Sequence, residues 1–334
     1  QSILPSLDSY RFNTPIANIE EADLVILCGT NPKIESPIIN HKIFKSYNAG
    51  TEIFNIGEDI SLNYPTHYLG QTLNDLDNDL LKKHLKKATN PILIVGSGFL
   101  NQFNSDNTLK ALFSFASKNK IITANKNNLN FLSPHASRVG QLLLGNTTDD
   151  ICHPFTKLKK KSFDTVLSFS SEYIADTAFK ESFKVYFGHH GDEGAMNADI
   201  VLPTPLYTEK NGIFINIEGR PQEAKKCHNP IGEAKEEWKI LKELSNQLSL
   251  NFEINTFDEL RAELSKDHPN LVNFHEIIDS AEKYEDQSDI LFESIPCVYP
   301  IKNFYMSDII SKNSKTMAKC VEDIISKPLL EKSA

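Results

Sequence analysis

Two adjacent histidines and their acidic neighbours are the side chains of this sequence that could serve metal or acid–base chemistry. They lie in residues 188–222, which also contain five acidic residues and five glycines. Adjacent residues of a strand point to opposite faces, so His189 and His190 could not hold one ion together there. Zinc prefers ligands spaced along the chain, and Asp192 and Glu193 add only a loose cluster. The pattern favours a polar turn that leaves a strand over a metal centre.

The cysteines lack the spacing of a metal cassette. No two of the five lie within three residues of one another, whereas zinc and iron–sulfur sites usually draw on closely spaced pairs. An odd number without regular spacing also argues against a disulfide framework and fits a reducing compartment. The five are Cys28, Cys152, Cys227, Cys297 and Cys320.

A candidate ligand site is the stretch CGTNPKIESP, residues 28–37, which follows a predicted strand and leads into a predicted helix. In open α/β sheets, ligands bind at the carboxyl ends of the strands. Gly29 would let a ligand approach the backbone, and the free amides of the helix would favour an anion such as phosphate. A capped strand-to-helix turn needs the same residues, so both interpretations stay open. Gly96 and Gly98 lack the third glycine of a dinucleotide fingerprint.

Charged residues beside a predicted hairpin form another candidate. Asn211-Gly212 lies between two alternating apolar runs, and both residues tolerate the positive φ of a type I′ turn. Glu209, Glu218 and Arg220 flank this hairpin and could pair with each other, bind a ligand or lie on the surface. The sequence contains no nucleophile elbow, Walker loop or HExxH helix.

The elements that position these residues alternate between strand and helix, which predicts parallel sheets with helical crossovers. Short β-branched runs indicate strands buried on both faces, and amphipathic stripes indicate helices. Predicted strands cover 24–28, 51–57, 91–95, 120–125, 164–170, 183–188 and 198–203. Predicted helices cover 37–48, 73–88, 105–118, 171–181, 234–248 and 256–266, with more helix near the end of the chain. A turn-rich segment covers about 127–161.

Length and charge limit the classes of function. The 334 residues suggest two domains, and the net charge of −9 argues against a nucleic-acid partner, which requires clustered Lys and Arg. The one basic run, residues 157–161, is interpreted as a solvated loop. No apolar run is long enough to span a membrane. The opening QSILPSLDSY has neither an initiator Met nor a signal peptide, so we interpret the chain as a fragment or processed product.

Residues 198–222 resemble the signature segment of the molybdopterin oxidoreductases. The matching residues are Leu202, Pro203, Glu209, Gly212, Asn216, Glu218, Gly219 and Arg220. The turn with Gly29, Asn31 and Pro32 is similar to the first nucleotide-cradling turn of that family. Residues 10–43, 187–203 and 304–321 each resemble the large iron–sulfur subunits of respiratory complex I, the G-subunit family of NADH–quinone oxidoreductases.

The resemblance implies an α/β fold of the molybdopterin oxidoreductase type. We expect parallel sheets with flanking helices in two Rossmann-like halves, followed by a β-hairpin and a helical C-terminal region. The expected parts are a first α/β unit over 1–130, a second over 131–205, a hairpin and helical segment over 206–290 and a tail over 291–334.

The resemblance also implies a structural, cofactor-free segment of an enzyme that passes electrons from NADH through iron–sulfur clusters to quinone, coupled to proton translocation. Gly29, Asn31, Asn216, Glu218 and Arg220 would then form a vestigial pterin cradle, with no catalytic residue and no metal ligand in this chain. The 2Fe-2S and 4Fe-4S clusters are expected in an N-terminal half outside this sequence.

The expected partners are the flavin-binding and cluster-bearing subunits of the peripheral arm, without nucleic acid or a direct membrane span. The arm would lie on the cytoplasmic side of a bacterial inner membrane or the matrix side of the mitochondrial one. A folded block beside the clusters could exclude water and offer surface to neighbouring subunits. The alternative is an active molybdopterin-dependent oxidoreductase that resembles formate dehydrogenase, and metal analysis would separate the two.

Overall fold

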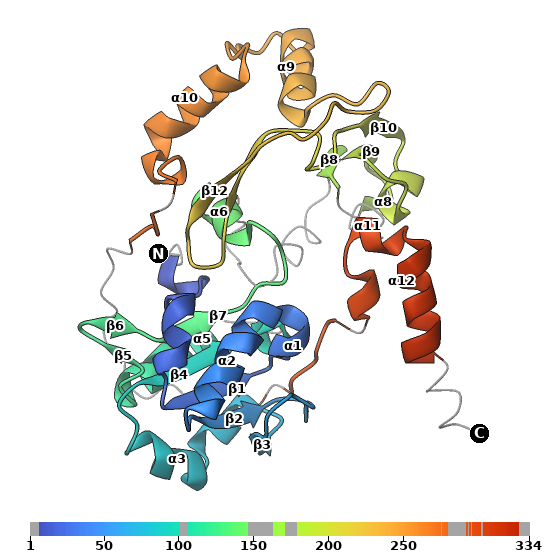
Figure 1. The fold of residues 1–334 in the computed structure, drawn as a ribbon. Coiled ribbons are helices and arrows are strands. Elements are labelled where there is room, and N and C mark those ends of the chain that lie inside the picture. The colour runs from blue at the N-terminus through green and yellow to red at the C-terminus, as the bar shows by residue number, and fades with distance from the viewer. Residues whose placement is uncertain are drawn as a thin grey trace. The chain divides into compact units, whose positions relative to one another are not determined.

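The computed structural model describes residues 7–100, 106–145, 163–170, 179–274, 276–279, 292, 294, 296–301 and 303–326 (Figure 1). The chain divides into two compact units. Unit 1 comprises Gln1–Pro154, Ile215–Arg220 and Glu276–Lys302, and unit 2 comprises Phe155–Phe214, Pro221–His275 and Asn303–Ala334. The domain boundaries expected from the sequence stay a prediction.

Unit 1 is built on a five-stranded parallel sheet of order β3-β2-β1-β4-β7. Its central strands, β1 and β4, are buried at every position, as their continuous apolar sequences predict. The strand order reverses between β1 and β4, so the chain leaves these two strands in different directions. The strands are β1 (Leu24–Cys28), β2 (Glu52–Ile56), β3 (His67–Gly70), β4 (Pro91–Val95) and β7 (Leu129–Phe131).

Helices cover both faces of this sheet (Figure 1). Val25 and Leu27 of β1 belong to one core cluster, together with Ile39 and Ile43 of α2 (Pro37–Asn48). Leu24, Ile26 and Cys28 belong to the cluster on the other face, with a 3-10 helix (Leu73–Asp77), α3 (Asp79–Leu85) and α5 (Asp106–Lys118). Alternate side chains of β1 therefore pack into two hydrophobic cores, one on each face of the sheet. The predicted α/β fold with parallel sheets is confirmed.

Two predicted elements of unit 1 are wrong in detail. The helix predicted over 73–88 is two pieces, because the Asn78 side chain accepts from the Leu80 amide (2.9 Å) and starts α3 as a separate helix.

The strand predicted over 120–125 is only β5 (Ile122–Thr123), which pairs with β6 (Lys126–Asn127) as an antiparallel ribbon. The sheet strand is β7, in the predicted turn-rich segment that also contains α6 (Arg138–Leu143). Its central Asn130, fully buried, concealed the strand in the sequence.

Unit 2 contains a three-stranded parallel sheet of order β10-β9-β8, and its strands confirm the three predicted in this half. The helices predicted over 234–248 and 256–266 are also present, within a few residues. The elements are β8 (Thr165–Phe169), β9 (Phe183–Gly188), α8 (Glu193–Met196), β10 (Ile200–Pro203), α9 (Glu237–Gln247), α10 (Phe257–Asp267), α11 (Ile309–Lys312), α12 (Lys315–Cys320) and a π-helical turn (Val321–Ser326). The basic run and residues 171–178 of the predicted helix lie outside the described residues.

The predicted hairpin exists, but its turn lies elsewhere. β11 (Gly212–Ile215) pairs with β12 (Pro221–Ala224), so Asn211-Gly212 lies at the start of the first strand instead of joining two strands. The turn runs from Asn216 to Arg220, where the Asn216 side chain accepts from the Glu218 and Arg220 amides at 3.1 and 2.8 Å. Gly219 supplies the positive φ, +86°. Residues 211–212 and residues 216–219 both contain Asn and Gly. Only Asn216 is positioned to accept hydrogen bonds from the backbone of the turn.

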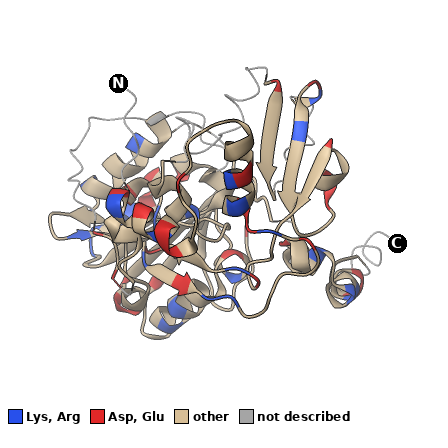
Figure 2. Cartoon of the chain, turned by 90° about the horizontal axis from the view of Figure 1, so that it is seen from above, with Lys and Arg blue, Asp and Glu red and all other residues tan. Residues whose placement is uncertain are grey.

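Residues of both charge signs occur along the described helices, as the blue and red segments of Figure 2 show. Among the described residues, none of the helices combines the length and the apolar character that a membrane crossing requires.

A matched pair of glycine substitutions tests the position of the turn. Gly219→Ala forces a side chain into positive φ, so we expect it to lower the free energy of unfolding of the full chain by about 1–2 kcal/mol. Gly212 has no positive φ, and a Cβ there would lie an ordinary 3.6 Å from the Phe214 ring. We expect Gly212→Ala to change stability by less than about 0.5 kcal/mol in urea denaturation. The reverse order would contradict this turn.

Candidate functional site

The predicted ligand site lies at the carboxyl edge of the five-stranded sheet, where the turns after β1 and β4 meet. Gly29 follows β1 with a φ of +58° and donates from its amide to the carbonyl of Ile56 (2.8 Å). The Gly96 amide donates to Cys28 O (2.9 Å), and the Gly98 amide donates to Gly29 O (2.8 Å). The two turns are therefore hydrogen-bonded directly to each other.

The glycines of these turns are required by packing within the chain. A Cβ on Gly29 would lie 2.5 Å from Cδ2 of the Phe99 ring and 2.9 Å from the Phe99 amide nitrogen. A Cβ on Gly96 would collide with Thr30. The sequence suggested that Gly29 lets a ligand approach the backbone. In the structure, the approaching group is the first turn of α4 (Ser97–Leu100).

A half-buried carboxylate takes the polar groups that an anionic ligand would need at this place. Glu35 ends α1 (Pro32–Glu35) and accepts from the Ser97 amide (3.1 Å) and from the hydroxyls of Ser97 and Thr30. Burial raises the pKa of Glu35, and the hydrogen bonds from Ser97 and Thr30 oppose that rise. A phosphate here would compete with Glu35 for its donors and be repelled by its charge.

Asn31, the second predicted residue of this turn, serves mainly through its backbone. Its carbonyl accepts from the amides of Ile34 and Glu35, both at 2.9 Å, and so starts α1. Its side-chain Oδ1 is buried and has no hydrogen-bond partner among the described residues. Among the buried side-chain atoms that the structure describes in this turn, it is the one without a hydrogen-bond partner.

The other three predicted cradle residues lie together in the hairpin turn. Glu218 accepts from the Ile16 amide through Oε1 (2.7 Å) and from the Asn216 side chain through Oε2 (3.1 Å). The neighbouring Ile217 carbonyl accepts from the Phe12 amide (2.9 Å). The turn with Asn216, Glu218 and Arg220 therefore holds the N-terminal segment, and Glu218 satisfies the start of the 3-10 helix Ile16–Glu21.

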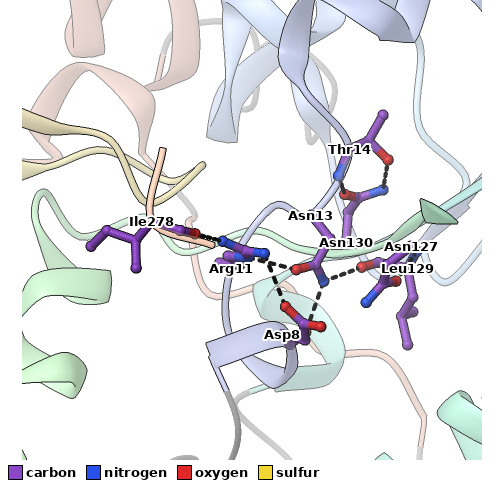
Figure 3. Close-up of polar contacts among 8 residues, drawn as sticks. All are labelled: Asp8, Arg11, Asn13, Thr14, Asn127, Leu129, Asn130 and Ile278. Atoms are coloured by element: carbon purple, nitrogen blue, oxygen red, sulfur yellow. Dashed lines mark hydrogen bonds and ion pairs between the residues drawn. The ribbon is translucent and has the colours of Figure 1, made fainter. Parts of the chain in front are cut away.

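Arg11 is the centre of a polar cluster that joins this turn to the rest of unit 1 (Figure 3). Its Nε donates to Asn13 Oδ1 (2.8 Å), an Nη pairs with Asp8 (3.0 Å), and the other Nη donates to the carbonyl of Ile278. The Ile278 amide donates in turn to Gly219 O (3.0 Å). Arg11 is buried, so its charge needs each of these partners.

Residues 11–14 also complete the edge of the sheet beside β7. Arg11 O accepts from the Phe131 amide (3.1 Å), and Thr14 N donates to the Asn130 side chain (2.7 Å). The Asn13 side chain donates to Leu129 O (2.7 Å) (Figure 3). The buried asparagine that hid β7 in the sequence therefore pairs with the N-terminal segment.

The histidine pair behaves differently from the sequence expectation. His189 and His190 follow the last residue of β9, Gly188, so strand alternation does not separate them, and their Nδ1 atoms lie 2.7 Å apart. This is a hydrogen-bond distance that requires a proton on one ring. Burial and the neighbouring His190 lower the pKa of His189. Asp192 caps α8 by accepting from the Ala195 amide (2.9 Å). Within the described ranges, no three His, Cys, Asp or Glu side chains are arranged to hold a metal ion.

The flanking acid Glu209 lies in unit 2, where it is buried and accepts from the Leu206 amide (2.9 Å). Sequence analysis missed Glu35, Ser97 and Arg11. The signal for Ser97 was a hydroxyl between two glycines directly after a buried strand. No comparable signal marks Arg11, because its backbone acceptor at Ile278 lies far away in the sequence, although Asp8 and Asn13 are close to it.

Comparison with known proteins adds the family. The sequence model of the molybdopterin oxidoreductases matches residues 4–247, and that of the C-terminal part of the NADH-ubiquinone oxidoreductase G subunit matches residues 275–320. The chain is 37% identical over 320 residues to the NADH-quinone oxidoreductase G subunit of Rickettsia bellii (strain RML369-C), covering 94% of this chain and 46% of that protein. It is 36% identical over 329 residues to the mitochondrial NADH-ubiquinone oxidoreductase 78 kDa subunit of Candida albicans, covering 94% and 45%. The chain therefore spans about half the length of the curated relatives it matches.

The raised pKa of Glu35 predicts a specific pH dependence of stability. The folded chain binds the Glu35 proton more tightly than the unfolded chain, so this contribution is present at low pH and is lost as pH rises through the folded pKa. We expect the melting temperature of wild type minus that of Glu35→Gln to decrease from pH 4.5 to pH 7. Glu35→Ala, which leaves the buried Ser97 amide without its acceptor, should cost about 1–3 kcal/mol at pH 7. A pH-independent difference between wild type and Glu35→Gln would contradict the assignment.

Proposed function

The chain belongs to the molybdopterin oxidoreductase family, and from this premise we propose that it is a structural, cofactor-free segment of the iron–sulfur subunit of an NADH–quinone oxidoreductase. The similar proteins are named as the G subunit or its mitochondrial counterpart, which supports this proposal over the alternative of an active molybdopterin-dependent enzyme. In the proposed assembly, electrons pass from NADH through iron–sulfur clusters to quinone, coupled to proton translocation. The clusters would be held outside the residues of this chain.

The observation that carries the cofactor-free part of the proposal is the half-buried Glu35 carboxylate between the turns after β1 and β4. A pterin cofactor that carries phosphate needs free amides and room at the carboxyl edge of the sheet. Here the Ser97 amide and the Ser97 and Thr30 hydroxyls already donate to Glu35. The residues at this edge therefore do not fit the group, although Asn31 Oδ1 has no hydrogen-bond partner in the part of the chain that the structure describes.

The hairpin half of the proposed cradle supports the same interpretation. Asn216 holds its own turn and Glu218 holds the start of the helix Ile16–Glu21, so their polar atoms serve the fold. We propose that Gly29, Asn31, Asn216, Glu218 and Arg220 are a vestigial cradle that now acts as structural support.

In the assembly, the segment would exclude water and provide a surface that neighbouring subunits contact. Apolar side chains on one face of the β8–β10 sheet are exposed: Leu167, Phe169, Phe183 and Ile200. Exposed apolar groups at neighbouring sheet positions are typical of contact with other proteins. We propose that the flavin-binding and cluster-bearing subunits are the partners, in a peripheral arm on the cytoplasmic side of a bacterial inner membrane or the matrix side of the mitochondrial one.

Substitution of a cradle residue in the intact complex tests this proposal. With Asn31→Ala on the chromosome, NADH–quinone turnover per assembled complex should stay within about twofold of wild type, because a structural residue contacts no reacting group, whereas loss of a transition-state contact costs about 100-fold or more. The exposed Asn18→Ala serves as the matched control. Turnover is normalised to the amount of complex resolved on native gels.

Elemental analysis of the same purified complex separates the two functions. The cofactor-free proposal expects no stoichiometric molybdenum or tungsten in either variant or in wild type. A one-to-one content of either metal in wild type that is lost in Asn31→Ala would establish the molybdopterin-dependent alternative.

A further inference from the structure

Residues 296–299, here called the crevice segment, lie across the carboxyl edge of the five-stranded sheet. The segment belongs to unit 1 and begins with an antiparallel bridge between Pro296 and Thr72. The Cys297 amide donates to Gln71 O (3.0 Å), and the Val298 amide donates to Gly98 O (3.2 Å). Residues from late in the chain therefore lie at the carboxyl edge of the sheet.

Tyr299 extends this contact to the remaining strands. Its amide donates to Glu58 Oε1 (3.2 Å), and its hydroxyl donates to Asn31 O (3.5 Å). Gln71, Glu58, Asn31 and Gly98 come after β3, β2, β1 and β4, which is the order of these strands in the sheet. The crevice segment therefore contacts the turn that follows each of four neighbouring strands.

The Cys297 side chain fills the space between the glycine turns. A Cβ on Gly57 would lie 3.0 Å from Cys297 Sγ, and a Cβ on Gly98 would lie 2.6 Å from it. Cys297 also packs against the core cluster that contains Cys28. Because these glycines have no side chains, there is room for one small group between the turns. The Cys297 thiol occupies this room.

We propose that the crevice segment takes the place of a bound cofactor. It occupies the position between β1 and β4 at which open α/β sheets bind ligands, and it excludes a pterin or nucleotide from that position. This inference rests on the proposed function only in naming a pterin or nucleotide as the ligand that is excluded. By joining the turns after four strands, the segment also fixes the C-terminal part of unit 1 to the sheet, as a ligand that bound there would fix the turns.

Thiol labelling measures whether the crevice segment stays in place. Burial raises the pKa of Cys297 to about 11, so its thiolate fraction at pH 8 is on the order of one thousandth. Cys227 is exposed and serves as the internal reference. In the native full chain treated with a maleimide, with sites identified by mass spectrometry, we expect Cys297 to react at least about tenfold more slowly than Cys227.

Two substitutions at Val298 separate the backbone contact from the side chain. Val298→Pro removes the amide that donates to Gly98 O and restricts the backbone of Cys297, so labelling of Cys297 should approach the rate of Cys227. Val298→Ala keeps the amide and changes a side chain that is 55% exposed, so Cys297 should stay protected. Circular dichroism verifies that both variants are folded.

A measurement on wild type covers the case in which Val298→Pro does not fold. In hydrogen exchange, the amides of residues 297–299 should be protected like those of β4, because all three donate to acceptors at the sheet edge. Fast exchange of these amides, or labelling of Cys297 in wild type at the rate of Cys227, would overturn the proposal. Neither result depends on metal content, so this inference and the proposed function fail separately.

Discussion

The direct contact between the turns after β1 and β4 is the constraint on which the rest of unit 1 depends. In open α/β sheets these turns diverge at the reversal of strand order and leave a crevice. Here Gly98 donates to Gly29 O and Phe99 packs where a side chain of Gly29 would lie. The glycines that such a fold uses to admit a ligand are thereby committed to contacts within the chain.

The electrostatics of the edge follow from the same contact. Once the turns meet, the amide at the start of α4 faces the interior, and a buried amide without an acceptor is costly. Glu35 supplies the acceptor, and the hydroxyls of Ser97 and Thr30 complete its hydrogen bonds. The half-buried Glu35 carboxylate already uses these donors, so the group that stabilises the closed edge also makes it unsuitable for phosphate.

The sequence predicted the parts of the fold whose signals are local. Leu24–Cys28 and Pro91–Val95 are continuous apolar runs, and both are strands. Where two sites offered the same local chemistry, as the two Asn and Gly pairs of the hairpin did, the sequence favoured the wrong turn. β7 was missed because Asn130 is satisfied by Thr14, a partner more than one hundred residues away. For the candidate site, Gly29 was located correctly at the strand end, but its neighbour Phe99 and the role of Glu35 depend on how distant turns pack.

Residues 276–279 and 296–299 belong to unit 1 and contact the rest of that unit at two separate places. At the β7 edge, Ile278 O accepts from Arg11 (Figure 3), and the Ile278 amide donates to Gly219 O. At the carboxyl edge, residues 296–299 contact the turns of four strands. Both attachments lie in the segment matched by the G-subunit family, and both use groups that the molybdopterin part of the chain provides. These C-terminal residues and the sheet of unit 1 therefore complement one another: the crevice segment fills a space that the glycines leave, and Arg11 has a complete set of partners only when Ile278 is in place.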